Sequence, residues 1–235
     1  MISVIIPARN AEQTLPATLS ALVPAAVDGI VKQVIVVDGG SSDATTEVAD
    51  QAAADVVKSG PGRGGQLAQG AAIARFPWLL FLNADTVLED SWERSATSFM
   101  RHVDLGERSI AAGAFTFRVD DKGLAPRLLE AVVELRCKLL RVPFADQGLL
   151  IPRRLFDEVG GYRNMPIMED LDLARRLGRR RLAMLDAKAV TSAERYRRDG
   201  YLSRSFRNQI CHMLYGAGIP VSMIARLHGK VETSA

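Results

Sequence analysis

Two acidic residues in this 235-residue chain each follow an apolar run, in a place where a carboxylate could bind a ligand. Asp38 follows the run VIVV, and Asp85 follows WLLFL, with Asn83 and one alanine in between. The carboxyl ends of parallel strands gather at one edge of a sheet, and ligands bind beyond that edge. Asn83 and Asp85 would aim two oxygens there at a divalent cation, a ribose or a diphosphate. An Asp that stands alone after a strand more often caps a turn, so the prediction of a ligand site depends on there being two such acids, Asp38 and Asp85.

A further cluster of acids lies in the segment MEDLDLARRL, residues 168–177. Acids at the start of a helix and arginines at its end are both favoured by the helix dipole. This structural role is sufficient to explain Glu169 and Asp172. Asp170 is a candidate general base for proton transfer if it faces a cleft that it shares with Asp85.

The segment GPGRGG, residues 60–65, has two functional interpretations. Its glycines Gly60, Gly62 and Gly65 match the dinucleotide-binding pattern G-x-G-x-x-G, so an NAD(P)-dependent oxidoreductase is one alternative. Against this, the strand expected before it is weak, the segment comes third in the chain, and Pro61 lacks the amide N–H that a phosphate would need. In the other interpretation the loop faces a diphosphate and Arg63 supplies the positive charge. An ordinary solvent-exposed loop would also fit.

The elements that would position these residues alternate between strands and helices through the first half of the chain. Apolar runs predict strands over residues 2–6, 34–37, 55–58, 78–82, 109–119, 149–151, 182–185 and 189–192. Helical spacing predicts helices over residues 15–23, 44–54, 66–75, 90–102, 124–140, 154–159, 168–177 and 201–215, with a short one through 227. The alternation implies right-handed crossovers and an α/β fold: a mostly parallel central sheet flanked by helices, with a helical C-terminal extension.

Composition limits the classes of protein to consider. A hydrophobic fraction of 48% and a charged fraction of 24% are ordinary for a folded globular protein, and a net charge of +3 gives no case for a nucleic-acid partner. Cys137 and Cys211 lack the spacing of a metal site, so we expect reduced cysteines and a cytoplasmic protein. The first strand begins at Ile2, which leaves no room for a signal peptide, and no apolar run is long enough to span a bilayer.

Arginines cluster in residues 175–181 and 195–207. A solvated helix face is the ordinary explanation for such a cluster. The alternative is that the basic C-terminal helices contact phosphates or the anionic inner face of a membrane. His212 lies in the same region, and a lone helical histidine is usually packed or on the surface, so we leave it out of the candidate site.

Four separated blocks, VIIPARN, VVDGGSSD, FLNADT and MEDLDLARRL, together resemble glycosyltransferase family 2, the nucleotide-sugar-dependent enzymes with the Rossmann-like GT-A fold. The blocks FADQGLLIPRRLFDEVGGY and TSAERYRRDGY resemble its bacterial radical-SAM/selenodomain-associated subgroup. The resemblance covers residues 2–230. It implies a single domain, with a nucleotide-binding half over 1–105, an acceptor and catalytic half over 106–195, and C-terminal helices over 196–235.

The resemblance also implies a role for each candidate residue. The residues expected on the donor side, at the nucleoside or the diphosphate, are Pro7, Asp38, Arg63, Asn83 and Arg195. The acceptor-side candidates are Asp146, Gln147 and Glu169. Asp85 would hold Mg²⁺ or Mn²⁺ against the diphosphate, and Asp170 would take the proton from the acceptor hydroxyl in an inverting transfer. The implied donor is a nucleotide sugar, most simply a UDP-sugar, and the acceptor is open.

Two positions depart from the pattern of this family. Asn83 stands where the metal-binding element usually has its leading acid, so we expect a lower metal affinity. Arg9 stands where many relatives have an acid. A non-catalytic nucleotide-sugar-binding protein therefore remains an alternative beside the transferase and the oxidoreductase built on Gly60, Gly62 and Gly65.

Overall fold

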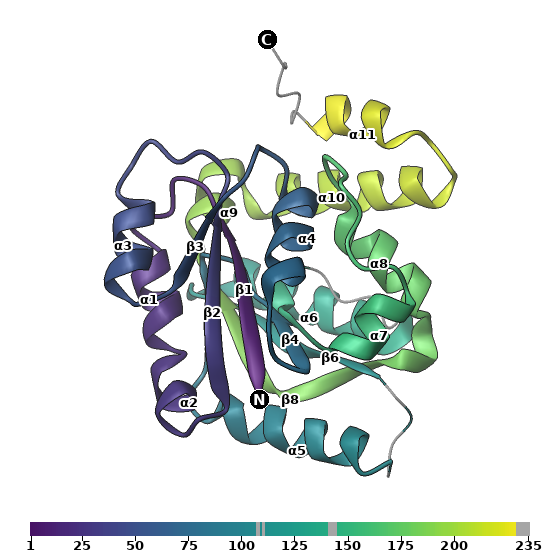
Figure 1. Ribbon diagram of the computed structural model, residues 1–235. Coiled ribbons are helices and arrows are strands. Elements are labelled where there is room, and N and C mark those ends of the chain that lie inside the picture. Colours follow the sequence, from purple (N-terminus) through teal and green to yellow (C-terminus); the bar gives the residue numbers. More distant parts are fainter. Residues whose placement is uncertain (107–108, 110, 141–144, 229–235) are drawn as a thin grey trace.

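The computed structural model describes residues 1–106, 109, 111–140 and 145–228 of the chain (Figure 1). Within these residues, one sheet of eight strands runs in the order β3-β2-β1-β4-β7-β6-β8-β5. The strands are β1 (Ile2–Ala8), β2 (Val31–Asp38), β3 (Asp55–Lys58), β4 (Trp78–Phe81), β5 (Thr86–Leu88), β6 (Ala112–Val119), β7 (Leu149–Pro152) and β8 (Leu182–Thr191). The strands β3, β2, β1 and β4 are parallel. β7 is antiparallel to both β4 and β6, β5 is antiparallel to β8, and β6 is parallel to β8.

Helices join these strands and extend the chain at its C-terminal end. They are α1 (Leu15–Ser20), α2 (Val23–Val27), α3 (Thr45–Gln51), α4 (Arg63–Ile73), α5 (Trp92–Asp104), α6 (Leu124–Leu140), α7 (Arg153–Glu158), α8 (Glu169–Leu177), α9 (Glu194–Asp199), α10 (Tyr201–Gly216) and α11 (Val221–His228). Short 3-10 helices η1 (Ala145–Gln147) and η2 (Arg179–Arg181) precede β7 and β8. Among the described helices, none has both the length and the apolar character that a membrane crossing requires.

The central strands are buried on both sides, so helices cover both faces of the sheet. β1 is buried at every residue. On one face α1, α2, α3 and α5 pack in an apolar cluster that includes Leu15 and Trp92. On the other face α4, α7 and α8 pack in a second cluster that includes Leu67 and Phe156 (Figure 1). These two layers fix the sheet edge at which β1 and β4 end.

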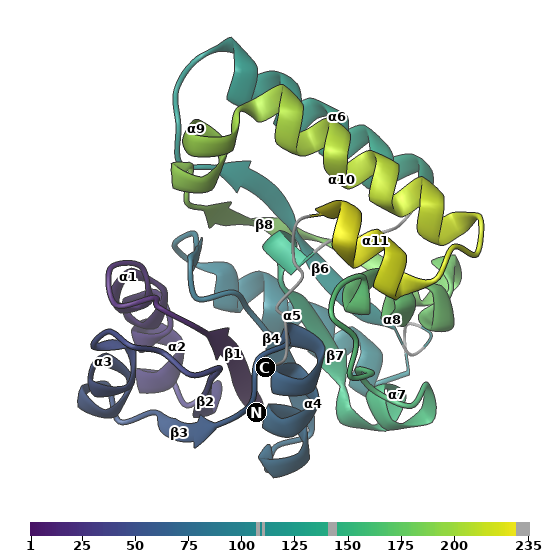
Figure 2. The same cartoon turned by 90° about the horizontal axis from the view of Figure 1, so that it is seen from above.

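The C-terminal helices lie beyond that edge. α10 and α11 lie above the carboxyl ends of the parallel strands (Figure 1), and α10 runs beside α6 (Figure 2). Cys211 of α10 and Ile224 of α11 are fully buried in a small cluster with Ile167, which precedes α8. The helical extension is therefore packed against the rest of the fold close to the predicted site.

The predicted α/β architecture is confirmed, with differences in individual elements. Residues 182–191 form the single strand β8 in place of two short strands, because alternating burial continues through the segment. The short strand β5 was not predicted, since its three residues carry too little pattern. The segment GPGRGG enters a helix at Arg63, three residues earlier than expected.

Candidate active site

A cavity of about 560 Å³ opens beyond the carboxyl ends of β1 and β4. These ends meet because β1 and β4 are parallel neighbours, with Ile5 opposite Phe81. The sequence-predicted residues that line the cavity are Pro7, Arg63, Asn83, Asp85, Asp146, Glu169 and Asp170. Ser192, which follows β8, also lines it, and its backbone N–H donates to the Asp85 carbonyl at 3.0 Å. The fold therefore gathers acids, amides and an arginine from distant parts of the chain in one recess.

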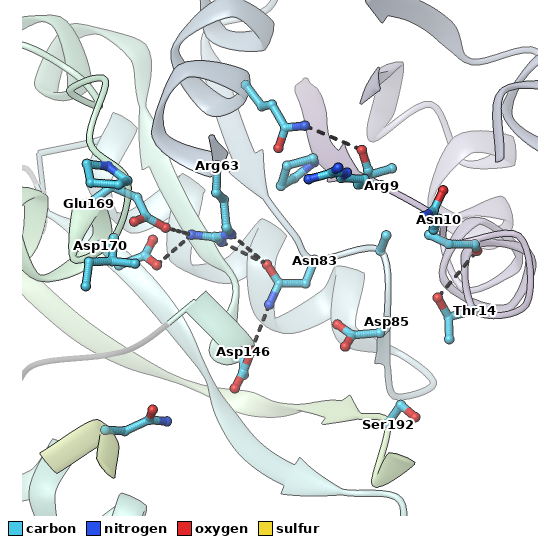
Figure 3. Close-up of a pocket in the computed structure, with 18 of the residues that line it drawn as sticks. Arg9, Asn10, Thr14, Arg63, Asn83, Asp85, Asp146, Glu169, Asp170 and Ser192 are labelled. Atoms are coloured by element: carbon cyan, nitrogen blue, oxygen red, sulfur yellow. Dashed lines mark hydrogen bonds and ion pairs between the residues drawn. The ribbon is translucent and has the colours of Figure 1, made fainter. Parts of the chain in front are cut away.

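Arg63 lies at the centre of this group (Figure 3). Its Nη1 donates to Glu169 Oε1 at 2.5 Å and to Asp170 Oδ2 at 2.6 Å. Its Nε and Nη2 donate to Asn83 Oδ1 at 3.2 and 2.8 Å. Burial alone would lower the pKa of Arg63, but the charges of Asp170 and Glu169 raise it above its usual range. Arg63 is thus a fixed cation held between two acids and an amide.

Asn83 connects Arg63 to Asp146. Its Nδ2 donates to Asp146 Oδ1 at 2.9 Å, and Tyr196 Oη donates to Asp146 Oδ2 at 3.5 Å. Asp146 belongs to η1, which lies between α6 and β7. A continuous series of side-chain hydrogen bonds therefore runs from the start of α8 through Arg63 and Asn83 to Asp146.

Asp170 has the environment of a proton acceptor. Its side chain is 19% exposed, and Oδ1 accepts a hydrogen bond from Tyr162 Oη at 3.1 Å. Burial, against the opposing effect of Arg63 and helped by the charge of Glu169, raises the pKa of Asp170 to about 6. A carboxylate with this pKa is ionised at neutral pH and is a better base than an ordinary Asp.

The glycine segment positions Arg63 by allowing a close backbone contact. A Cβ on Gly64 would lie 2.3 Å from the Arg163 carbonyl oxygen and 3.0 Å from the Met165 nitrogen. Gly62 caps α4 with φ +118°, a conformation that favours glycine. The glycines thus pack the start of α4 against residues 163–165, which precede α8. The interpretation as a dinucleotide-binding loop is not supported, because the segment's tightest contact is with this backbone.

Asp38 is not among the residues that line the cavity. It is 4% exposed, and its carboxylate accepts hydrogen bonds from the backbone N–H groups of Gly40 and Ser41. Ser41 Oγ in turn accepts from the Asn10 N–H at 2.9 Å, and Asn10 lines the cavity. The Asp38 side chain organises the loop next to the cavity that Asp85 and Asp170 line, and its expected role at the nucleoside stays a prediction.

Gln147 is also outside the cavity, at 1% exposure. Its Nε2 donates to the Phe115 carbonyl at 2.9 Å, and its Oε1 accepts from Cys137 Sγ at 3.3 Å. Gln147 therefore anchors η1 to β6 and α6 and holds its neighbour Asp146 in place. The side chain of Arg195 lies outside the part of the chain that the structure describes.

Several lining residues were not selected from the sequence. They are Asn10, Thr14, Gln66, Ser192, Arg198 and Asn208. His212, which the sequence analysis left out of the site, also lines the cavity. Asn208 and His212 are four residues apart and share a face of α10, and this spacing was the one signal that could have identified them.

The side chains that line the cavity suit a metal ion that is held mainly by the phosphates of a bound substrate. Among the described residues, no group of three or more His, Cys, Asp or Glu side chains could hold a metal by itself. Asp85 lines the cavity, and the Asn83 amide oxygen faces Arg63. Mg²⁺ is often bound through one or two carboxylates together with substrate phosphates and water, and the residues present fit that pattern.

Solved structures show which proteins this fold is similar to. Glucosyl-3-phosphoglycerate synthase from Mycobacterium tuberculosis, in complex with Mn²⁺, UDP-glucose and phosphoglyceric acid, is 26% identical with a TM-score of 0.60, over 94% of this chain and 80% of that one. The same protein with Mn²⁺, UDP and glucosyl-3-phosphoglycerate is 25% identical with a TM-score of 0.58, over 94% and 81%. Mannosyl-3-phosphoglycerate synthase from Rubrobacter xylanophilus is 20% identical with a TM-score of 0.61, over 94% and 76%, and shows the fold alone. The fold is thus the GT-A fold of glycosyltransferases.

The sequence comparisons agree at the level of the family. A search of curated proteins found no match. The profile of glycosyl transferase family 2 matches residues 3–165, which is more than half of the chain. The more specific resemblance to the radical-SAM/selenodomain-associated subgroup stays a prediction. The chain belongs to glycosyl transferase family 2 and is a glycosyltransferase.

Proposed function

We propose that this enzyme transfers a sugar from a UDP-sugar to an acceptor hydroxyl, with inversion at the anomeric carbon and Asp170 as the general base. The observation that carries the proposal is that Asp85 and Asp170 line one cavity at the end of the parallel strands. A similar protein, 26% identical, was crystallised with UDP-glucose and Mn²⁺. This supports a nucleotide-sugar donor for a cavity of the same fold.

The donor diphosphate would lie on the Asp85 side of the cavity. Mg²⁺ or Mn²⁺ bound there would neutralise the charge that develops on the departing diphosphate. Asp85 would supply a carboxylate to that ion. Arg9 directly follows β1 and Arg63 begins α4, and both arginines line the cavity. The roles of Pro7, Asp38 and Arg195 at the nucleoside and diphosphate stay predictions.

The acceptor would lie on the Asp170 side. Asp170 would accept the proton of the hydroxyl as its oxygen forms a bond to the anomeric carbon, on the face opposite to the breaking bond to the diphosphate. Ionised Asp170 is the form that can accept this proton, and its pKa of about 6 makes it available at neutral pH. Glu169 shares Arg63 with Asp170 and would hold the guanidinium in place.

The acceptor itself is best sought among small hydroxy acids. The similar structures contain phosphoglyceric acid or its glucosyl product. We propose phosphoglyceric acid as the first acceptor to test. A cytoplasmic location and a contact of the basic C-terminal helices with a membrane surface also remain predictions.

A screen of nucleotide sugars tests this function. Binding and hydrolysis of UDP-, GDP- and dTDP-sugars are measured with and without Mn²⁺, and then with candidate acceptors. We expect a UDP-sugar to bind and to be turned over, and NADH to produce no thermal shift, because only a true ligand raises the melting midpoint by mass action. Binding of a sugar nucleotide without turnover by any acceptor would favour the non-catalytic alternative.

A further inference from the structure

Asn83 occupies the position at which this family usually has an acid that binds the metal. In this chain both polar atoms of the Asn83 side chain have hydrogen-bond partners within the protein. Its Oδ1 accepts from Arg63 Nε at 3.2 Å and from Arg63 Nη2 at 2.8 Å. Its Nδ2 donates to Asp146 Oδ1 at 2.9 Å.

These partners fix the orientation of the amide. A flipped amide would place its NH₂ group against the guanidinium of Arg63, which has only donors. It would also place its oxygen against the carboxylate of Asp146, which has only acceptors. The two lone pairs of Asn83 Oδ1 are used by the two N–H groups of Arg63. Asn83 therefore links Arg63 to Asp146 and does not present an oxygen to a metal.

Asp146 is the carboxylate that hydrogen-bonds to Asn83, at whose position this family usually has an acid. It lines the same cavity as Asp85, and Figure 3 draws both carboxylates below the Asn83 side chain, Asp146 to its left and Asp85 to its right. Its position is built into the fold, because the buried Gln147 ties η1 to Phe115 of β6 and to Cys137 of α6. A carboxylate held within 2.9 Å of the Asn83 amide can reach much of the space that a carboxylate at position 83 would serve.

We propose that acid and amide have exchanged places in this chain: Asp146 supplies the second carboxylate of the metal and diphosphate site, and Asn83, itself oriented by Arg63, holds it there through the hydrogen bond from its Nδ2. This inference rests on the proposed function. Asn83 is then a positioning residue and Asp146 a ligand-binding residue, contributed from 63 positions further along the chain.

The test separates the charge of Asp146 from its hydrogen bond. In Asp146→Asn the amide oxygen at position 146 can still accept from Asn83 Nδ2, so a purely structural role predicts little change. We expect the affinity for UDP in the presence of Mn²⁺, measured by calorimetry, to fall at least about tenfold, since even groups that only hydrogen-bond to a metal's ligands are worth about 10- to 100-fold in metal affinity. Electron paramagnetic resonance of Mn²⁺ with UDP present should show the same loss.

The double variant Asn83→Asp/Asp146→Asn restores the pair with the roles reversed. We expect it to bind UDP with Mn²⁺ within about threefold of wild type, which corresponds to less than 1 kcal/mol. Asp157→Asn, an exposed acid on α7, is the matched control and should bind as wild type does.

Four outcomes would overturn the inference. Wild-type affinity in Asp146→Asn, or a double variant no better than that single variant, would contradict it and leave the proposed function standing. A wild-type chain that binds no UDP with Mn²⁺ would overturn both. If Asp146→Asn does not fold, as judged by its melting curve without ligand, the double variant decides: near wild-type affinity supports the exchange and a tenfold loss contradicts it.

Discussion

Arg63 Nη1 lies 2.6 Å from Asp170 Oδ2, and this ion pair joins the first turn of α4 to the first turn of α8. The base proposed for the acceptor side is therefore held by a cation that also contacts Asn83 on the donor side. A donor diphosphate that draws the guanidinium towards itself would leave Asp170 with less positive charge beside it. The pKa of Asp170 would then rise, and the base would become stronger as the donor binds.

The pH dependence of transfer tests the role of Asp170. Because the ionised form accepts the proton and the pKa of Asp170 without ligand is about 6, kcat/KM should rise with pH through about 6 and level off above it. Asp170→Asn removes the base and should lower kcat by about 10²- to 10⁴-fold with a smaller change in KM. Initial rates across pH 4.5 to 8.5 measure both effects, with Asp157→Asn as the control. Retention of near wild-type turnover in Asp170→Asn would show that another group is the base.

The same pKa predicts a change in stability with pH. In the unfolded chain Asp170 titrates near 3.8, and in the folded protein near 6, so the folded state is stabilised by the protonated form. That contribution is complete below pH 3.8 and is lost as the pH rises through about 6. Asp170→Asn keeps a neutral side chain at every pH, so its melting temperature relative to wild type should be higher at pH 7 than at pH 4. A difference that is constant or decreases with pH would contradict the raised pKa.

Replacement of Arg63 should affect both sides of the cavity. Arg63→Ala leaves Glu169 and Asp170 without their shared cation, so the lower limb of the pH–rate profile should move to higher pH. Removal of one partner from a largely buried pair should also destabilise the fold by about 3 kcal/mol. Arg63→Lys keeps the charge but loses the paired hydrogen bonds to Asn83, so it should keep the pH midpoint and bind UDP more weakly. An unchanged midpoint in Arg63→Ala would refute the coupling.

Two glycines of the GPGRGG segment, Gly60 and Gly64, should respond differently to substitution. In Gly64→Ala the new Cβ meets the backbone of Arg163 and Met165, so the start of α4 must move, at a cost of about 1–3 kcal/mol. In Gly60→Ala the new Cβ has open space, and stability should change by less than about 0.5 kcal/mol. Chemical denaturation measures both variants. Equal effects, or a larger one at Gly60, would contradict the packing role given to this segment.

The sequence predicted the parts of the fold and site that depend on local patterns. Continuous apolar runs located β1, β2 and β4, and acids placed directly after β4 and at the start of α8 identified Asp85 and Asp170. Seven of the predicted site residues line the cavity, because they lie at the end of a strand, directly after one, or in the first turn of a helix at the same edge of the sheet.

The remaining features depend on contacts that no local pattern contains. Asp38 also follows a strand, yet its carboxylate is used by its own loop. The sequence predicts that Asn83 lowers the metal affinity, and only the structure shows that it joins Arg63 to Asp146. His212 reaches the cavity because α10 folds back over the sheet edge, which depends on long-range packing.

A crystal structure with UDP and Mn²⁺ tests the central claim most directly, namely that one cavity holds the donor between Asp85 and Asp170. We predict that the diphosphate and the ion lie on the Asp85 side, with the Asp170 carboxylate facing the open space where the sugar and the acceptor hydroxyl would meet. Nucleotide bound elsewhere on the molecule, or bound with Asp170 turned away from that space, would contradict the account.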